Sequence, residues 1–415
     1  MRILLYECRK VIQSPIFLGL FLLFSVYNIY LIVSSSDHKE ELKIVNELID
    51  IYGRDISDTS LARLDQDIQQ EMTQLKRSVG LEFESVQELL ENMSLEEQET
   101  YSQEQWSQIQ QLAVKEMYFN TARSIDENYA VITIQAAGED EVRRYGLSGS
   151  AASYLLQEYE KLDKRFKELV KNEEHKQWFF AGKAYFMHSF LFQTVFRHII
   201  IESLLLIVLA TALITAYEFE QKTQLLMFST KRGRKLMKDK LTASIVIALV
   251  TMIFLLGITL GTFFIVFDYS HVWSTSISSA FNWEYNFPYI AWWDISFETF
   301  LWLVAGIVLA GGLLMSCLTF ALSAVVKNSY IAFAGIALFF VAVLLLPSFM
   351  SKSSILFFIT GYNLSQLLLG IPNSFMGGGL TGSRNYEWLT VSCWTLIAAG
   401  ICFVAYRRFT KMDIG

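Results

Sequence analysis

Six long runs of apolar residues dominate the pattern of hydrophobic and polar positions along the chain. Each run carries almost no charge. Each is long enough to cross a hydrocarbon core of about 30 Å, because a helix rises about 1.5 Å per residue. The runs lie at 16–33, 199–216, 241–267, 297–326, 330–346 and 388–406. The pattern therefore predicts an all-α membrane protein with six transmembrane helices.

The first run has a second interpretation, which is a cleaved signal peptide. Its apolar stretch is longer than the roughly 7–15 residues typical of signal peptides. We therefore interpret residues 1–34 as an N-terminal segment followed by the first transmembrane helix.

The distribution of lysine and arginine predicts the orientation of these helices. Residues 268–296 contain neither, and residues 347–387 contain only two. Basic residues gather instead at Arg2, Arg9, Lys10, Lys222, Lys231, Arg232, Arg234, Lys235, Lys238, Lys240, Lys327, Arg407, Arg408 and Lys411. Because short cytoplasmic segments carry an excess of these residues, we expect a multi-pass membrane protein with both termini in the cytoplasm.

Residues 35–196 differ in composition from the rest of the chain. They contain 30 acidic and 17 basic residues, a net charge of −13, whereas the remainder carries +6. Helix-forming Glu, Gln, Leu and Lys dominate, and no proline occurs between Pro15 and Pro288. An acidic, helix-rich block inside an apolar frame predicts a large extracellular helical insertion between helices one and two. Residues 197–415 then hold helices two to six.

Local signals indicate how the insertion is built. All four cysteines lie outside it, so helix packing must hold it together without disulfides. Ser94–Glu97 is a capping-box pattern that predicts a helix over 95–123. From about Ala151 the helical pattern returns and is expected to run through Trp178 towards the second span, which would make the insertion a stalk.

Two apolar stretches are too short or too polar for simple spans. Residues 179–196 fit either an interfacial amphipathic helix or the outer half of a long second helix. Residues 354–369, in the last outer loop, fit a broken hairpin that is re-entrant or interfacial.

Motifs for catalysis by this chain alone are absent from the sequence. It contains no G-x-x-x-x-G-K-[ST] loop for nucleotide phosphates, no H-E-x-x-H and no G-x-S-x-G. The five histidines are dispersed and no zinc-type cysteine spacing occurs. We therefore expect no catalytic residues, no metal, no cofactor bound by this chain and no nucleic-acid partner; the lipid bilayer is the expected surrounding.

Charged residues inside the apolar runs are candidates for function by default. Glu202 lies inside the second run, and His198 precedes it by one helical turn. A local His198–Glu202 pair would satisfy the carboxylate, which makes these residues a candidate intramembrane polar site. Glu298 begins the fourth run and is interpreted as an interfacial residue.

The segment between the second and third runs, 218–240, has an ordered chemistry. Glu218 and Glu220 come first, the apolar patch 225–228 follows, and a basic run leads into the next helix. A loop that contacts only anionic lipid explains the basic half. It does not explain the order of acidic, apolar and basic residues.

This order resembles the cytoplasmic coupling loop of the ABC-2 type transporter permeases. The matching positions are Glu218 or Glu220, Leu225, Leu226, Ser229, Arg232 or Arg234, and Lys240. Residues 322–329 resemble the family's cytoplasmic link between helices four and five. The chain departs from the family pattern at Lys222-Thr223, where glycine-threonine is usual, and in its large insertion, which is typical of members that handle peptides or antibiotics.

The resemblance implies the permease subunit of an ABC exporter in a bacterial plasma membrane that moves a peptide, antibiotic or lipid-like substrate outward. It implies two copies of a separate ATPase subunit, which bind ATP and magnesium, and a second permease subunit, identical or homologous. The docking residues it implies are Glu218, Glu220, Leu225, Leu226, Phe228, Arg232 and Arg234. The alternative is a non-transporting assembly or signalling protein whose extracellular domain binds or senses an envelope partner.

Overall fold

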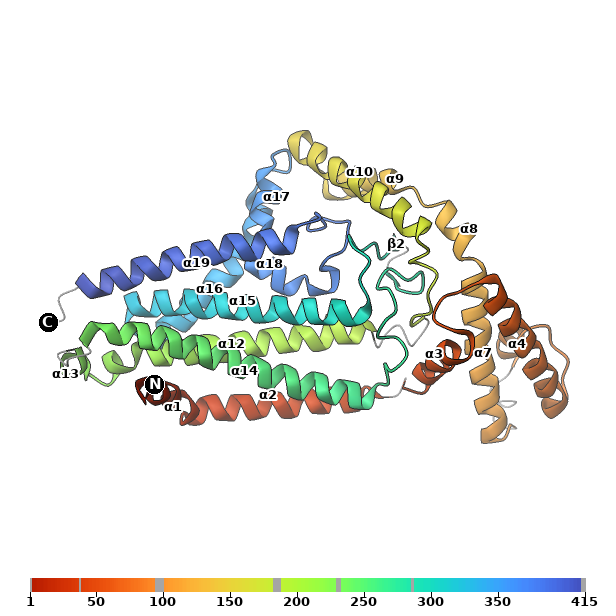
Figure 1. Ribbon diagram of the computed structural model, residues 1–415, viewed down its shortest axis with the longest axis horizontal. Helices are drawn as coiled ribbons and strands as arrows, with labels where there is room; N and C mark the ends of the chain where they lie inside the picture. Colours follow the sequence, from red (N-terminus) through yellow and green to blue (C-terminus); the bar gives the residue numbers. More distant parts are fainter. Residues whose placement is uncertain are drawn as a thin grey trace.

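The computed structural model describes residues 2–36, 39–93, 101–181, 188–228, 233–284 and 287–411. Within these ranges the fold is predominantly helical (Figure 1). Two short strands, β1 (Trp283–Glu284) and β2 (Phe287–Pro288), pair antiparallel in a connection between two of the long helices.

Six helices of the described chain are long and apolar enough to cross a membrane, which confirms the number predicted from hydropathy. They are α2 (Pro15–Ser34), the π-helix η2 (Phe190–Val195) continued by α12 (Phe196–Glu220), α14 (Leu236–Val266), α15 (Phe297–Val326), α16 (Ser329–Leu345) continued by η4 (Leu346–Phe349), and α19 (Tyr386–Lys411). They lie roughly side by side in one bundle (Figure 1).

The ends of these helices follow local capping chemistry. Ser14 and Pro15 begin α2, since a serine side chain accepts the backbone N–H of Phe17 and proline fits the first helical position. Lys327 ends α15 in the left-handed conformation, and Asn328 then caps α16 by accepting the N–H of Ile331. The fourth and fifth spans are therefore joined by a two-residue turn.

The bundle has a central pair and a periphery. Most of the apolar length of α12 and α15 is buried, whereas α2, α16 and α19 expose most of theirs. Gly311 and Gly312 let neighbours approach α15 closely, because a Cβ at Gly311 would meet Leu368 and one at Gly312 would meet Met252. The exposed apolar sides of the outer helices are suited to contact with lipid or with another membrane protein.

The insertion after the first span is built from short and medium helices. They are α3 (Lys39–Tyr52), α4 (Asp58–Val79), α5 (Val86–Asn92), α7 (Gln103–Arg123), α8 (Ile125–Ala130), α9 (Ile134–Tyr145) and α10 (Gly149–Lys171). In Figure 1 they arch over one end of the bundle, from α3 and α4 round to α10 beside α17 (Leu356–Gly361). Both ends of the chain lie at the opposite end of the bundle.

Several boundaries differ from the sequence expectation. The helix predicted over 95–123 is α7, which begins at Gln103 with a capping box formed by Ser102 and Gln105; the pattern at Ser94–Glu97 falls outside the described residues. The helix expected to run through Trp178 ends at Lys171, because Glu173 takes a positive φ of 56° and turns the chain.

The stretch 179–196 is divided between two environments. Phe179 and Phe180 are fully buried beside Trp178 and are not helical, whereas Phe190 begins the helix that continues as α12. From Phe190 onward the stretch is therefore the half of a long second span nearest the insertion, and the span starts before the expected boundary at 197. Residues 182–187 of the stretch lie outside the described residues.

The insertion does not stand away from the bundle as a stalk. One continuous hydrophobic core joins Leu64 and Leu155 of the insertion to Phe263 and Phe300 of the spans. Main-chain hydrogen bonds reinforce this contact: Ala280 N–H donates to the His175 carbonyl at 2.9 Å, and Ser150 N–H donates to the Ser353 carbonyl at 3.0 Å. The insertion is thus attached to the connections that follow the third and fifth spans.

The last large connection contains a short helical pair. The helices α17 and α18 (Leu364–Leu369) are separated by Tyr362 and Asn363, and Asn363 caps α18 by accepting the Gln366 N–H. Leu368 lies in van der Waals contact range of Gly311 in α15. The break between two short helices agrees with the interruption predicted for 354–369, and the re-entrant or interfacial hairpin stays a prediction.

The buried side chain of His175 makes the stability of the insertion depend on pH. Its side chain is only 1% exposed and its ring centroid lies 4.4 Å from that of Tyr129. Neither ring nitrogen has a hydrogen-bond partner within the described residues. Burial, helped by the nearby Lys176 charge, lowers the pKa of His175 to about 4. In the unfolded chain the His175 imidazole binds a proton below its ordinary pKa of about 6.5, whereas in the folded protein it stays neutral down to about pH 4. The free energy of unfolding therefore falls as the pH drops below about 6.5.

We predict that the insertion loses about 2 kcal/mol of stability between pH 7.5 and pH 5 through this residue. His175→Phe should remove this dependence, because the ring nitrogens have no partners to lose. The measurement is thermal unfolding in detergent, followed by tryptophan fluorescence at both pH values. His271→Phe is the control, since His271 is exposed. An unchanged pH dependence in His175→Phe would contradict the assignment.

Candidate functional site

Four short segments meet at the end of the bundle that holds both chain termini. They are the N-terminal helix α1 (Arg2–Ile12), the end of α12, the short helix α13 (Gln224–Phe228), and the turn η3 (Gly233–Lys235) that leads into α14. The loop predicted at 218–240 is therefore shorter than expected, because its first residues belong to α12 and its last to α14.

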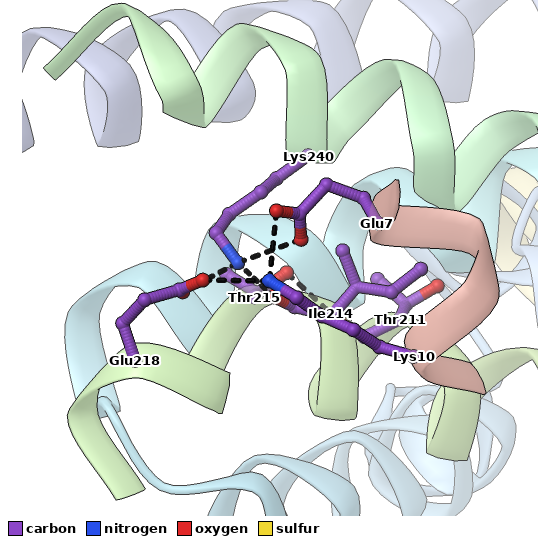
Figure 2. A network of polar contacts seen from close by, with 7 residues as sticks. All are labelled: Glu7, Lys10, Thr211, Ile214, Thr215, Glu218 and Lys240. Carbon is purple, nitrogen blue, oxygen red and sulfur yellow. Dashed lines mark hydrogen bonds and ion pairs between the residues drawn. The ribbon is translucent and has the colours of Figure 1, made fainter. Parts of the chain in front are cut away.

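A closed network of four charged side chains ties α1, α12 and α14 together at this end of the bundle (Figure 2). Lys10 Nζ donates to Glu7 Oε1 at 2.8 Å and to Glu218 Oε1 at 2.7 Å. Lys240 Nζ lies 3.1 Å from Glu7 Oε2 and 2.6 Å from Glu218 Oε2. Each ammonium thus bridges both carboxylates, and the cluster is electrically neutral.

The network is shielded from solvent. The side chain of Lys240 is 0% exposed, those of Glu7 and Glu218 are 3% and 2% exposed, and that of Lys10 is 16% exposed. Lys240 also donates to the main-chain carbonyl of Ile214 in α12 (Figure 2). Two hydrogen bonds therefore hold the buried ammonium, one to Glu7 of α1 and one to the main chain of α12, and the Glu218 carboxylate lies beside it as a second counter-charge.

Ion pairing outweighs burial at Lys10. Burial alone would lower the pKa of this ammonium, but the hydrogen bonds that it donates to Glu218 and Glu7 raise the pKa above its ordinary value. The ring of Tyr217 lies below the ammonium, 4.5 Å from Nζ to the centroid, and adds a cation–π contact. Lys10 therefore keeps its charge, and with it the balance of the network.

Glu220 makes a second anchor at the end of α12. Its Oε1 accepts the backbone N–H and the hydroxyl of Ser329, both at 2.6 Å. Ser329 is the first residue of α16, where an anion is favoured by the helix dipole and by the free N–H groups. The two acidic residues at the start of the loop thus hold three other helices: α1 and α14 through Glu218, and α16 through Glu220.

The apolar residues of the loop face outward. Leu225 and Leu226 on α13 are 59% and 71% exposed. Beside them a cavity of about 870 Å³ opens between α13 and α1; its lining includes Ile3, Tyr6, Arg9, Gln13, Thr223, Leu226, Met227 and Leu236. An apolar ridge next to a hollow of this size is suited to receive part of another protein.

The expected docking residues therefore divide into two groups. Leu225 and Leu226 lie on the surface, whereas Glu218 and Glu220 point into the bundle as anchors. Phe228 ends α13 and Arg234 lies in η3, but their side chains are not described; Arg232 lies outside the described residues.

The expected His198–Glu202 pair is not formed. Glu202 Oε2 instead accepts from Asn28 Nδ2 of α2 at 2.7 Å, and the same amide donates to Thr259 Oγ1 of α14 at 3.1 Å. All three side chains are at least 95% buried. His198 packs edge-on against Tyr27. The Glu202 carboxylate thus receives its hydrogen bond from a neighbouring span and not from the residue one turn earlier in its own helix.

Sequence reasoning missed four of the residues that make these contacts: Glu7, Lys10 and Lys240 as network members, and Asn28 as the partner of Glu202. Weak signals existed for two of them. Lys240 lies five residues inside the long helix α14, and Asn28 is an amide inside an otherwise apolar run. A buried polar side chain in a span implies a partner on another helix.

Comparison with known proteins gives no relative. No family model, no curated protein and no solved structure matches the chain.

Within the described residues, no group of three or more His, Cys, Asp or Glu is placed to hold a metal ion.

We predict that Lys240→Met destabilises the protein by about 3–5 kcal/mol, since it leaves two buried carboxylates with a single cation. Adding Glu218→Gln to Lys240→Met should recover part of this loss, because it restores neutrality. Thermal unfolding in detergent is the measurement, and Lys235→Met, at an exposed lysine of the same region, is the control. Equal effects of the single and double variants would show that the charges do not act as one network.

We also predict that Asn28→Leu lowers stability by about 1–3 kcal/mol, because Glu202 then lacks its donor. The double variant Asn28→Leu/Glu202→Leu should be closer to wild type in thermal unfolding than Asn28→Leu alone. His198→Leu tests the pairing expected from the sequence, and we expect a smaller effect than for Asn28→Leu. The reverse order would contradict the interhelical assignment.

Proposed function

We propose that this protein is the permease subunit of an ABC-2 type exporter, with a separate ATPase subunit that docks on α13 and the adjoining face of α1. The observation that carries the proposal is the anchoring of a short exposed apolar helix. Leu225 and Leu226 face outward, while the residues just before them fix the loop to α1, α14 and α16. A docking element must be both accessible and mechanically connected.

The backbone at Lys222 supports the same alignment. The family pattern has glycine at this place, and Lys222 takes a positive φ of 56°, a conformation that glycine adopts most readily. The residue ends α12, and Thr223 N–H then returns to the Glu218 carbonyl at 2.9 Å. A left-handed residue is thus needed here to turn the chain from α12 into α13.

In the proposed mechanism, nucleotide binding in two ATPase subunits moves the coupling loops of two permease subunits. Force on α13 would reach α1 and α14 through the buried charge network, and α16 through the Glu220–Ser329 contact. The ATPase shifts the spans only if it binds two arrangements of the loop with different free energies. A peptide, antibiotic or lipid-like substrate would then leave on the side of the insertion.

A second function has one specific observation in its favour. The insertion is bonded to the connections after the third and fifth spans, so movement of those spans would move it as well. The protein would then be a membrane machine that acts on an envelope partner through the insertion and carries no substrate. Uptake into inside-out proteoliposomes in the presence of the ATPase distinguishes the two, because only the exporter accumulates substrate.

We predict that Leu225→Asp/Leu226→Asp abolishes co-purification with an ATPase subunit, the first candidate being a P-loop ATPase encoded beside this chain. Charges on the apolar ridge would have to be desolvated in the complex, at a cost of several kcal/mol. Val131→Asp is the matched control, since Val131 is an exposed apolar residue of the insertion. An intact complex with the double variant would rule out α13 as the docking element.

A further inference from the structure

An apolar groove runs along the outside of α15, between α14 and α19, in the half of the bundle nearest the chain termini. Its volume is about 530 Å³. Leu314, Cys317 and Phe320 of α15 form its floor, and the small residues Ala398, Ala399 and Thr395 keep the α19 wall open. It is distinct from the cavity beside α13, which has a different lining.

The length of the groove matches one leaflet of a membrane. Its lining on α19 extends from Thr395 to Tyr406, which corresponds to about 16 Å at a rise of about 1.5 Å per residue. Half of a hydrocarbon core of about 30 Å is about 15 Å. A groove of this length between two spans can hold an extended acyl chain along most of its course.

Two cations lie at the end of the groove nearest the termini. Lys238 lines the groove, and its Nζ lies 5.1 Å from the ring centroid of Tyr406. The guanidinium of Arg407 lies 4.9 Å from the ring centroid of Phe403, another lining residue. Both side chains are exposed, and neither forms an ion pair with a carboxylate in the part of the chain that the structure describes.

From this arrangement we infer that the groove is a binding site for one acidic phospholipid of the leaflet on the side of the chain termini. One of its two acyl chains lies over Cys317 and beside Ala399, and its phosphate lies at Lys238 and Arg407. Each basic residue at the membrane surface favours an anionic headgroup. The apolar floor binds an acyl chain whatever headgroup the lipid carries. The site stands whether or not the protein is a permease.

The test uses the purified full-length chain in detergent and native mass spectrometry. Phosphatidylglycerol and phosphatidylcholine with identical acyl chains are titrated separately. For the wild type we expect the first phosphatidylglycerol to bind about tenfold more tightly than the first phosphatidylcholine. In Lys238→Gln/Arg407→Gln this ratio should fall to about one, while binding of phosphatidylcholine is retained. Arg408→Gln, adjacent on the same helix, should keep the wild-type ratio.

A second pair of variants tests the groove itself. Ala399→Trp fills the groove and should reduce binding of both lipids, whereas Leu396→Trp adds the same side chain at a 75% exposed position outside the groove lining and should not. Thermal unfolding confirms that each variant is folded.

Three outcomes would overturn the inference. The first is an unchanged headgroup preference in Lys238→Gln/Arg407→Gln. The second is full lipid binding in Ala399→Trp. The third is a change of oligomeric state in Ala399→Trp with lipid binding retained, which would identify the groove as a contact between copies of the chain.

Discussion

A neutral set of four buried charges holds the helices together at the end of the bundle that carries both chain termini. Two ammonium groups and two carboxylates pair in a ring, so no charge is left without a counter-charge in a place from which water is excluded. The ring connects α1, α12 and α14, which otherwise meet mainly through apolar side chains. Hydrophobic contacts permit sliding, whereas paired charges with short hydrogen bonds favour one arrangement.

Polar contacts between spans recur along the bundle. The Asn28–Glu202 pair joins α2 to α12, with Thr259 adding α14, and Thr211 and Ser316 share a hydrogen bond at 2.9 Å between α12 and α15. In lipid there is little hydrophobic force between helices, so close packing and such hydrogen bonds determine how spans associate. The central helix α12 takes part in each of these contacts, in keeping with its burial.

The insertion and the spans form one continuous structure. Shared hydrophobic core and main-chain hydrogen bonds attach the insertion to the connections after the third and fifth spans. At the other end, Glu218 and Glu220 attach the loop between spans two and three to α14 and α16, the same two helices. The proposed docking ridge and the insertion are therefore connected through the same pair of spans, which is what either an exporter or a force-transmitting machine requires.

The sequence by itself determined the six spans, the helical insertion and the position of the polar loop. These features depend on local hydropathy, helix propensity and capping, which are properties of neighbouring residues. Tertiary structure alone decided the partners of the buried charges. Lys240 and Glu7 are far apart in the chain, and the carboxylate of Glu218 is turned inward although Leu225 and Leu226 of the following loop face outward. Such pairings depend on how helices pack in space, and a pattern along one segment carries no information about which segment lies against it.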